Sequence, residues 1–282
     1  MLSFAKLLRP VNCLVMCFGV IVGVVLAAGD IAIVGQLGGR LWLAAIAAFC
    51  LGASANSIND YFDVEADRIN RPRRPIPSED VSASTAQVTW LILLVVGVVL
   101  SFILSVGHGV LALLAGWAMF WYSASLKRQS TFGNIVVALV VGLVVVYGAM
   151  LHRINMPVMV GAVFALLTTM VREIIKDIED QEGDRKVGSR TIPIVHGVQT
   201  ARRVIVGVTL LTVLLLPMPY LLMSFNGLYM LGVMVAGFLM LIGAWIVVHF
   251  DDMMSIRRGS LLLKSTMVIG MLRLSIAQIM WM

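Results

Sequence analysis

The chain has 282 residues, of which 60% are hydrophobic and 13% are charged, and its mean hydropathy is +0.98. Soluble domains average about 45–50% apolar and about 25% charged residues, so a soluble fold of this size lacks the polar residues to cover its surface. Three cysteines exclude a disulfide scaffold, and the high hydrophobicity excludes a disordered chain. Apolar runs without period-two alternation indicate a multi-spanning helical membrane protein.

Nine apolar stretches are each long enough to cross a bilayer as a helix, which takes about 17–25 residues. We therefore predict an all-α fold, a bundle of nine transmembrane helices in a single domain over residues 1–282. Two polar segments, about 59–86 and 172–203, are predicted to be loops on the cytoplasmic side. The predicted spans are 11–28, 41–58, 87–107, 109–126, 134–151, 157–175, 204–224, 227–249 and 260–280.

The basic residues predict the orientation of this bundle. With the N-terminus inside, 18 of the 21 Lys and Arg residues lie on the inner side; only Arg40 and Arg153 lie outside, and Arg273 falls within the last span. Because Lys and Arg accumulate in cytoplasmic loops, we expect a cytoplasmic N-terminus and an outer C-terminus in the cell membrane. The net charge of +6 then reflects topology and contact with anionic lipids, and not nucleic-acid binding.

The acidic residues are concentrated in the two polar segments. Twelve of the 15 lie between residues 60 and 80 or between residues 173 and 184. Cytoplasmic loops ordinarily favour Lys and Arg, so this enrichment needs a chemical reason. Both segments follow even-numbered spans, which end on the same side of the membrane. We therefore expect the two acidic clusters to meet above the bundle.

The spacing within each cluster predicts a metal site. Asn59, Asp63 and Asp67 follow one another at i, i+4 and i+8, and Asp180 and Asp184 repeat the i, i+4 step. On a helix such residues share one face, where stacked carboxylates repel. A bound divalent cation removes that repulsion, and hard oxygen ligands suit Mg²⁺, which also binds substrate phosphates. A solvated loop that merely ends a helix is the alternative for either cluster alone.

Basic residues beside the clusters indicate the substrate. Arg74-Pro-Ile-Pro follows the first cluster and Arg190-Thr-Ile-Pro follows the second. Metal ions bridge the oxygens of a diphosphate, and Arg and Lys donate charge-assisted hydrogen bonds to them. Neither a nucleotide phosphate loop nor a dinucleotide glycine fingerprint occurs. A diphosphate at the mouth of an apolar bundle therefore predicts a polyprenyl diphosphate, whose tail occupies an apolar cavity that opens to the cytoplasmic side.

At these residues the sequence resembles a known family. The two aspartate motifs, together with nine spans, resemble the UbiA superfamily of intramembrane prenyltransferases, and the resemblance covers essentially the whole chain. The segment from Arg172 to Asp184 is similar to the archaeal digeranylgeranylglyceryl phosphate synthases, which form the second ether bond of archaeal membrane lipids. The resemblance implies one UbiA-type domain in which Mg²⁺ and, through it, the diphosphate are held by Asn59, Asp63, Asp67, Asp180 and Asp184.

The resemblance also implies roles for neighbouring residues. Asp60 and Asp177 are expected to be secondary ligands or a catalytic base. The family carries a Tyr-x-x-x-Lys motif on span four, whereas Tyr122 and Lys127 are five residues apart here. Lys127 is a catalytic candidate because it stands at an inner helix end, within reach of a leaving diphosphate. The candidate ligands of the diphosphate are Arg74, Lys127, Lys176, Arg190, Tyr122, Asn12 and Arg9.

Two of these candidates also fit simpler roles. Asn12 lies just inside the first span, where an amide equally suits a helix-to-helix hydrogen bond. Arg9 precedes the same span and suits positive-inside anchoring.

The reaction implied is Mg²⁺-dependent transfer of a geranylgeranyl group onto the hydroxyl of geranylgeranylglyceryl phosphate, whose proton passes to Asp60, Asp177 or the diphosphate. The expected partners are a polyprenyl diphosphate, a lipid-like acceptor and membrane lipids; no protein partner is implied. An aromatic or quinone-precursor acceptor is the first alternative. An ion-coupled transporter is the second, although its acidic residues would lie at the midplane.

Overall fold

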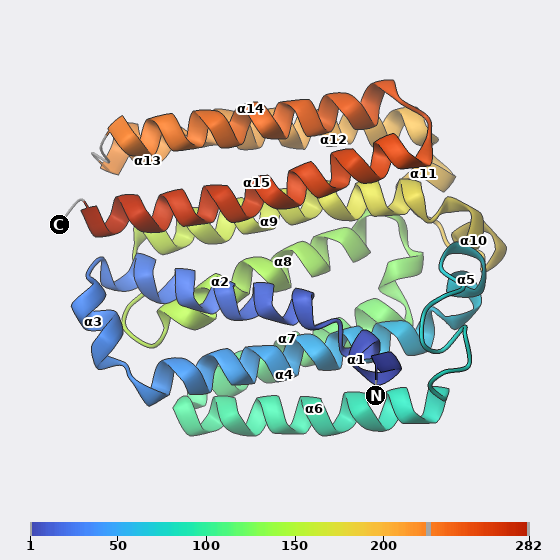
Figure 1. Cartoon of the computed structure of the whole chain (residues 1–282), viewed down its shortest axis with the longest axis horizontal. Helices are drawn as coiled ribbons and strands as arrows, with labels where there is room; N and C mark the ends of the chain where they lie inside the picture. The colour runs from blue at the N-terminus through green and yellow to red at the C-terminus, as the bar shows by residue number, and fades with distance from the viewer. Residues whose placement is uncertain (1, 224–226, 281–282) are drawn as a thin grey trace.

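A computed structural model describes residues 2–223 and 227–280. This part of the chain is helical apart from connecting turns and one isolated bridge between Gln129 and Arg190. Figure 1 shows the long helices lying roughly side by side, with the short ones at the two ends of the bundle. In chain order the helices are α1 (Leu2–Leu8), α2 (Pro10–Ala28), α3 (Ile31–Gln36), α4 (Gly39–Phe62), α5 (Val64–Asn70), α6 (Ala83–Leu104), α7 (Val106–Ala124), η1 (Leu126–Arg128), α8 (Ser130–Ala149), α9 (Met156–Glu179), α10 (Gln181–Lys186), α11 (Ile192–Val195), α12 (Val198–Leu215), α13 (Met218–Met223), α14 (Gly227–His249) and α15 (Met253–Met280).

Within the described residues nine helical segments are long and apolar enough to cross a membrane, which confirms the predicted number. The bounds differ most where a helix is longer than its apolar part. The ninth span begins at Met253, before the predicted residue 260, because α15 continues through a charged turn that contains Arg257 and Arg258. The seventh begins at Val198 for the same reason. Hydropathy detects the part of a helix inside the lipid, whereas the backbone hydrogen bonding continues beyond it.

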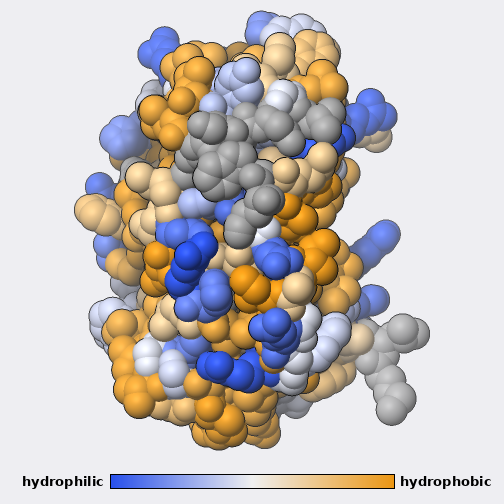
Figure 2. Space-filling model, turned by 90° about the vertical axis from the view of Figure 1, so that its left-hand side faces the viewer, coloured by the Kyte–Doolittle hydropathy of each residue, from blue (hydrophilic) through white to orange (hydrophobic). Residues whose placement is uncertain are grey.

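The sides of the bundle are apolar, as a lipid-facing surface requires. Large side chains such as Trp42, Leu214 and Phe238 are exposed on them. Figure 2 views the end of the bundle opposite α5 and α10, and shows hydrophilic residues near the middle of that end with hydrophobic residues around its rim. Exposed apolar surface on this scale marks contact with lipid rather than water.

Glycines allow α2 and α8 to pack in close contact. A Cβ atom on Gly148 would overlap the backbone of Val20, and one on Gly23 would overlap the backbone of Val145. Small residues at such crossings let two membrane helices approach closely. Because α2 also packs against α4, and α8 against α9, this crossing helps to form one wall of the central cavity.

The two polar segments are mostly helical rather than open loops, which corrects the sequence-based expectation. α5 follows directly on α4, and α10 follows directly on α9. These two short helices pack against each other at one end of the bundle, to the right in Figure 1. We call this end, formed by α5, η1 and α10, the motif end. It brings together two segments that are separated by four membrane spans.

Candidate active site

The first aspartate motif lies at the junction of α4 and α5. Asn59 is in the last turn of α4, Asp63 joins the helices, and Asp67 is in α5. Backbone hydrogen bonds from Asp63 N to Asn59 O (3.0 Å) and from Asp67 N to Asp63 O (2.8 Å) preserve the helical register. The three buried side chains therefore share one face, and the Asn59 amide donates to a carboxylate oxygen of Asp63 at 2.6 Å.

The second motif has the same local structure. Asp180 caps the C-terminus of α9, and Asp184 lies one turn later in α10. The backbone N–H of Asp184 donates to the carbonyl oxygen of Asp180 at 3.1 Å, and both carboxylates are buried. A second pair of carboxylates is thus held at the i, i+4 spacing.

Asn70 joins the two motifs. Its amide nitrogen donates to the carbonyl oxygen of Asp180, and its amide oxygen accepts from the backbone N–H of Gly183, both at 2.8 Å. Arg71 forms an ion pair with Asp180 at 2.8 Å. A Cβ atom on Gly183 would lie 2.5 Å from the carbonyl oxygen of Ala66, so only glycine permits this packing. The predicted meeting of the acidic clusters therefore depends on specific contacts between α5 and α10.

Lys127 lies between the motifs and neutralises the first. Its ammonium, on η1, forms an ion pair with Asp63. Burial opposes both charges, but their mutual attraction outweighs it, which lowers the pKa of Asp63 and raises the pKa of Lys127. Lys127 also interacts electrostatically with Asp180 and Asp184.

Two arginines neutralise the outer part of the first motif. Arg74 pairs with Asp67 and, at 3.3 Å, with Asp60. Arg9 pairs with the same oxygen of Asp60. The other carboxylate oxygen of Asp60 is buried and has no hydrogen-bond partner in the described part of the chain. Asp60 is therefore a carboxylate shared by two guanidinium groups.

The chemistry of these groups fits Mg²⁺. Four carboxylates and an amide are hard oxygen donors of the kind that this ion prefers. Burial raises the pKa of Asp184 to about 6, although Lys127 opposes the rise, so this carboxylate gains from a nearby positive charge. Among the described residues no three acidic, His or Cys side chains are close enough together to hold a metal. Arg71, Arg74 and Lys127 pair with three of these carboxylates.

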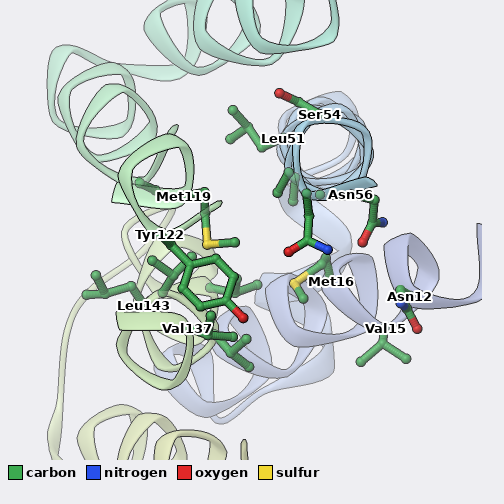
Figure 3. Close-up of a pocket in the computed structure, with 18 of the residues that line it drawn as sticks. Asn12, Val15, Met16, Leu51, Ser54, Asn56, Met119, Tyr122, Val137 and Leu143 are labelled. Carbon is green, nitrogen blue, oxygen red and sulfur yellow. The ribbon is translucent and has the colours of Figure 1, made fainter. Parts of the chain in front are cut away.

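A cavity lies between α2, α4, α7, α8, α9 and α15, and its lining includes Asn59 of the first motif. Figure 3 shows the ring of Tyr122 extending from α7 into this space, where Met119 and Val137 also lie, with Met16 of α2 opposite. Most of the lining is apolar, which suits an isoprenoid chain. Of the predicted diphosphate ligands, Arg9, Asn12, Tyr122 and Lys176 line the cavity.

The other predicted residues have different surroundings. Asp177 accepts a hydrogen bond from the Asn134 amide at 2.8 Å, and Lys176 lies 3.4 Å from Glu173. Neither Asp177 nor Asp60 lines the cavity as it stands. Arg190 is exposed and is not among the cavity residues, so its contact with a diphosphate stays a prediction.

Four site residues were missed from the sequence. Asn70 and Arg71 lie three and four residues after Asp67, so the i+4 position of Arg71 was an available signal. Asn134 is a polar residue in an apolar span, which by itself marks a functional candidate. Glu173, the shared partner of Arg172 and Lys176, was counted only as one of the acidic residues.

Comparison with known proteins agrees with this geometry. The sequence pattern of the UbiA prenyltransferase family matches residues 16–265. The chain belongs to the UbiA prenyltransferase family. It is therefore a multi-pass membrane prenyltransferase.

Its relatives include digeranylgeranylglyceryl phosphate synthases. One from Methanosphaera stadtmanae is 34% identical over 95% of this chain and 96% of its own, and one from Thermococcus gammatolerans is 34% identical over 99% of both. A solved structure from work on digeranylgeranylglyceryl phosphate synthase in membranes superimposes with a TM-score of 0.76 at 29% identity, covering 99% of this chain and 98% of that one. A UbiA homologue from Archaeoglobus fulgidus, bound to DMAPP and Mg²⁺, shares the fold with a TM-score of 0.67 at 19% identity, covering 97% and 99%.

Proposed function

We propose that this enzyme transfers a geranylgeranyl group from geranylgeranyl diphosphate to geranylgeranylglyceryl phosphate, forming the second ether bond of archaeal membrane lipids. The observation that carries the proposal is the pairing of two aspartate motifs at the mouth of an apolar cavity. The identity of 34% with digeranylgeranylglyceryl phosphate synthases, over nearly the full length of both chains, supports this acceptor.

The motif end is the proposed site of the Mg²⁺-diphosphate group. The ion would be held by Asn59, Asp63, Asp67, Asp180 and Asp184, whose donor chemistry fits it. When bound, Mg²⁺ supplies Lewis-acid stabilisation of the charge that develops on the departing diphosphate. The solved structure of the Archaeoglobus fulgidus homologue with DMAPP and Mg²⁺ supports the same combination of ligands here.

In this proposal the basic side chains at the motif end bind the diphosphate. Lys127 and Arg74 are paired with carboxylates in the present state, so each is already positioned at the motif end. With Mg²⁺ held by these carboxylates, Lys127 and Arg74 would donate hydrogen bonds to phosphate oxygens. Preorganised donors of this kind stabilise negative charge as it grows in the transition state. Lys176, on the cavity wall, faces the same charge.

The mechanism also needs a cavity that excludes water and a base that removes the proton of the acceptor. The apolar lining around Tyr122 excludes water from the allylic cation, which water would otherwise capture. The acceptor hydroxyl attacks this carbon and loses its proton. Asp177, which accepts one hydrogen bond from the neutral amide of Asn134, is a better candidate for the base than Asp60, because Arg9 and Arg74 both pair with one carboxylate oxygen of Asp60. The diphosphate itself is the third candidate.

We place the motif end on the cytoplasmic side of the membrane, with the N-terminus inside and the C-terminus outside. The distribution of 18 basic residues on one side and two on the other supports this orientation.

The decisive experiment offers radiolabelled geranylgeranyl diphosphate to the purified enzyme with either geranylgeranylglyceryl phosphate or an aromatic acceptor. We expect Mg²⁺-dependent label in a diether lipid phosphate. Label only in the aromatic product would replace the proposed acceptor. Gradient-driven uptake into vesicles without prenyl transfer would replace the enzyme by a transporter.

A further inference from the structure

A second cluster of charge lines the cavity away from the motif end. Thr168, Arg172 and Lys176 follow one another at i, i+4 and i+8 on α9, and all three line the cavity. One face of this helix is therefore directed at the substrate space. On α15, Lys264 lines the same cavity. It lies close enough to Arg172 for their like charges to interact.

This cluster carries more positive than negative charge. Arg172 and Lys176 share a single carboxylate, Glu173, at 3.4 Å each. Lys264 has no ion pair or hydrogen bond among the described residues. Three cations therefore face one carboxylate, and even without Lys176 the charges of Arg172 and Lys264 exceed that of Glu173 by one. At the motif end the positive charges are not in surplus. Each of four cations there is paired with an aspartate: Lys127, Arg71, Arg74 and Arg9.

Like charges on the wall of a membrane cavity are costly unless an anion compensates them. Lys176, one turn before Asp180, is near enough to the motif end to serve the diphosphate. Arg172 and Lys264 have no such explanation. Arg172 stands eight residues before Asp180, which is about 12 Å along the axis of α9. An anion at Arg172 and Lys264 therefore occupies a different place from the diphosphate.

We propose that Arg172 and Lys264 bind the phosphate group of the acceptor lipid, at a subsite separate from the metal–diphosphate site. This assignment rests on the proposed function, in which the acceptor is a phosphate monoester. Such a group carries about −1.5 to −2 charges at pH 7, which is the sign of charge that compensates the surplus on this wall. Arg provides a planar fork for two phosphate oxygens and Lys a point charge, a combination suited to a terminal phosphate.

The subsite also places the reacting atom. In a glycerol phosphate the free hydroxyl is only a few bonds from phosphorus. A phosphate held at Arg172 directs that hydroxyl along α9 toward the motif end, where the prenyl carbon leaves its diphosphate. Tyr122 lines the same cavity as Arg172 and Lys264. Arg172 and Lys264 therefore select a phosphorylated acceptor and set its direction in the cavity.

The test measures acceptor KM, donor KM and kcat for Lys264→Met and Arg172→Gln, with geranylgeranylglyceryl phosphate and with its dephosphorylated form. We expect each variant to raise the KM of the phosphorylated acceptor about 10–100-fold, as loss of a charged hydrogen bond predicts. Donor KM should change less than about twofold. With the dephosphorylated acceptor the variants should match the wild type, because there is no phosphate to lose.

Matched controls separate charge from folding. Lys264→Arg keeps the charge and should stay within about threefold of the wild type. Arg258→Gln removes a charge from the same helix at an exposed position whose side chain contacts Met254, and it should change no constant. Thermal unfolding in detergent checks that Lys264→Met is folded.

Three results would overturn the subsite. Equal KM changes for both acceptors would assign the residues to general packing. An effect that requires anionic lipid and disappears in neutral detergent would assign them to a membrane headgroup. Unchanged KM in folded variants would leave them without a ligand. Absence of any wild-type turnover with geranylgeranylglyceryl phosphate is a separate outcome, which overturns the proposed function and with it the acceptor of this subsite.

Discussion

Replacing Gly183 by alanine tests whether catalysis depends on the contact between α5 and α10. The added Cβ would lie 2.5 Å from both the carbonyl oxygen of Ala66 and the amide nitrogen of Asn70. Real Cβ atoms do not approach so closely, so α10 must move away or Asn70 must give up its hydrogen bonds to Asp180 and Gly183. Overpacking of this kind costs about 1–3 kcal/mol.

Gly183→Ala should also change the distance between the two aspartate motifs. The metal and diphosphate require Asp63 and Asp67 on one side and Asp180 and Asp184 on the other at a fixed separation. A displacement of about 1 Å between reacting groups can cost about 100-fold in rate. We therefore expect kcat of Gly183→Ala to fall by about two orders of magnitude, whereas the apolar cavity continues to bind the prenyl tail.

The assay is steady-state transfer from labelled geranylgeranyl diphosphate at saturating Mg²⁺, with thermal unfolding measured in the same detergent. Gly207→Ala is the matched control, because Gly207 is exposed on α12 and a Cβ atom added there would meet no other atom within 4 Å. It should keep its kcat and gain up to about 1 kcal/mol of stability, as an alanine in a helix does. If Gly183→Ala turned over within twofold of the wild type, the two motifs would not need the spacing that this contact sets.

Three further predictions follow from the charges. Asp63→Asn or Asp180→Asn should lower kcat at least 100-fold in a folded protein, and EDTA should silence the wild type until Mg²⁺ is restored; activity in both variants would exclude them as metal ligands. Because the pKa of Asp184 is raised to about 6, protonation competes with Mg²⁺ below that pH, and the Mg²⁺ concentration for half-maximal activity should rise about tenfold per pH unit there; a flat profile from pH 5 to 7 would refute this. A reporter at the C-terminus should be active outside the cell and one inserted between residues 128 and 133 inside; a shared side would refute the topology.

The sequence predicted the spans because hydropathy responds directly to the lipid. It also predicted the shared face of Asn59, Asp63 and Asp67, since helical spacing is a local property. It did not predict that residues 64–70 form a short helix packed on α10. That helix depends on Asn70 and Gly183, which are 113 positions apart, and no periodicity connects such residues.

The sequence also did not predict the ion-pair and hydrogen-bond partners of the charged site residues. Lys127 was expected to contact only a leaving diphosphate, whereas it pairs with Asp63 in this state. Asp177 was selected for its position in a cluster, yet its hydrogen bond comes from Asn134 on another span. Pairing between spans depends on how the helices rotate about their axes, and rotation is set by packing such as the Gly23 and Gly148 contacts between α2 and α8.

Three of the four motif carboxylates, those of Asp63, Asp67 and Asp180, are paired with cations. A buried carboxylate without a partner is costly, so Lys127, Arg71 and Arg74 stabilise the fold around these aspartates. If Mg²⁺ were held by these carboxylates, the same cations would be available to donate hydrogen bonds to a diphosphate. The same cations therefore serve two negative groups, the motif carboxylates and the diphosphate. Removing Lys127 should accordingly weaken both the metal-free fold and the transition state, and a variant that lost only one of the two would show that Lys127 serves a single partner.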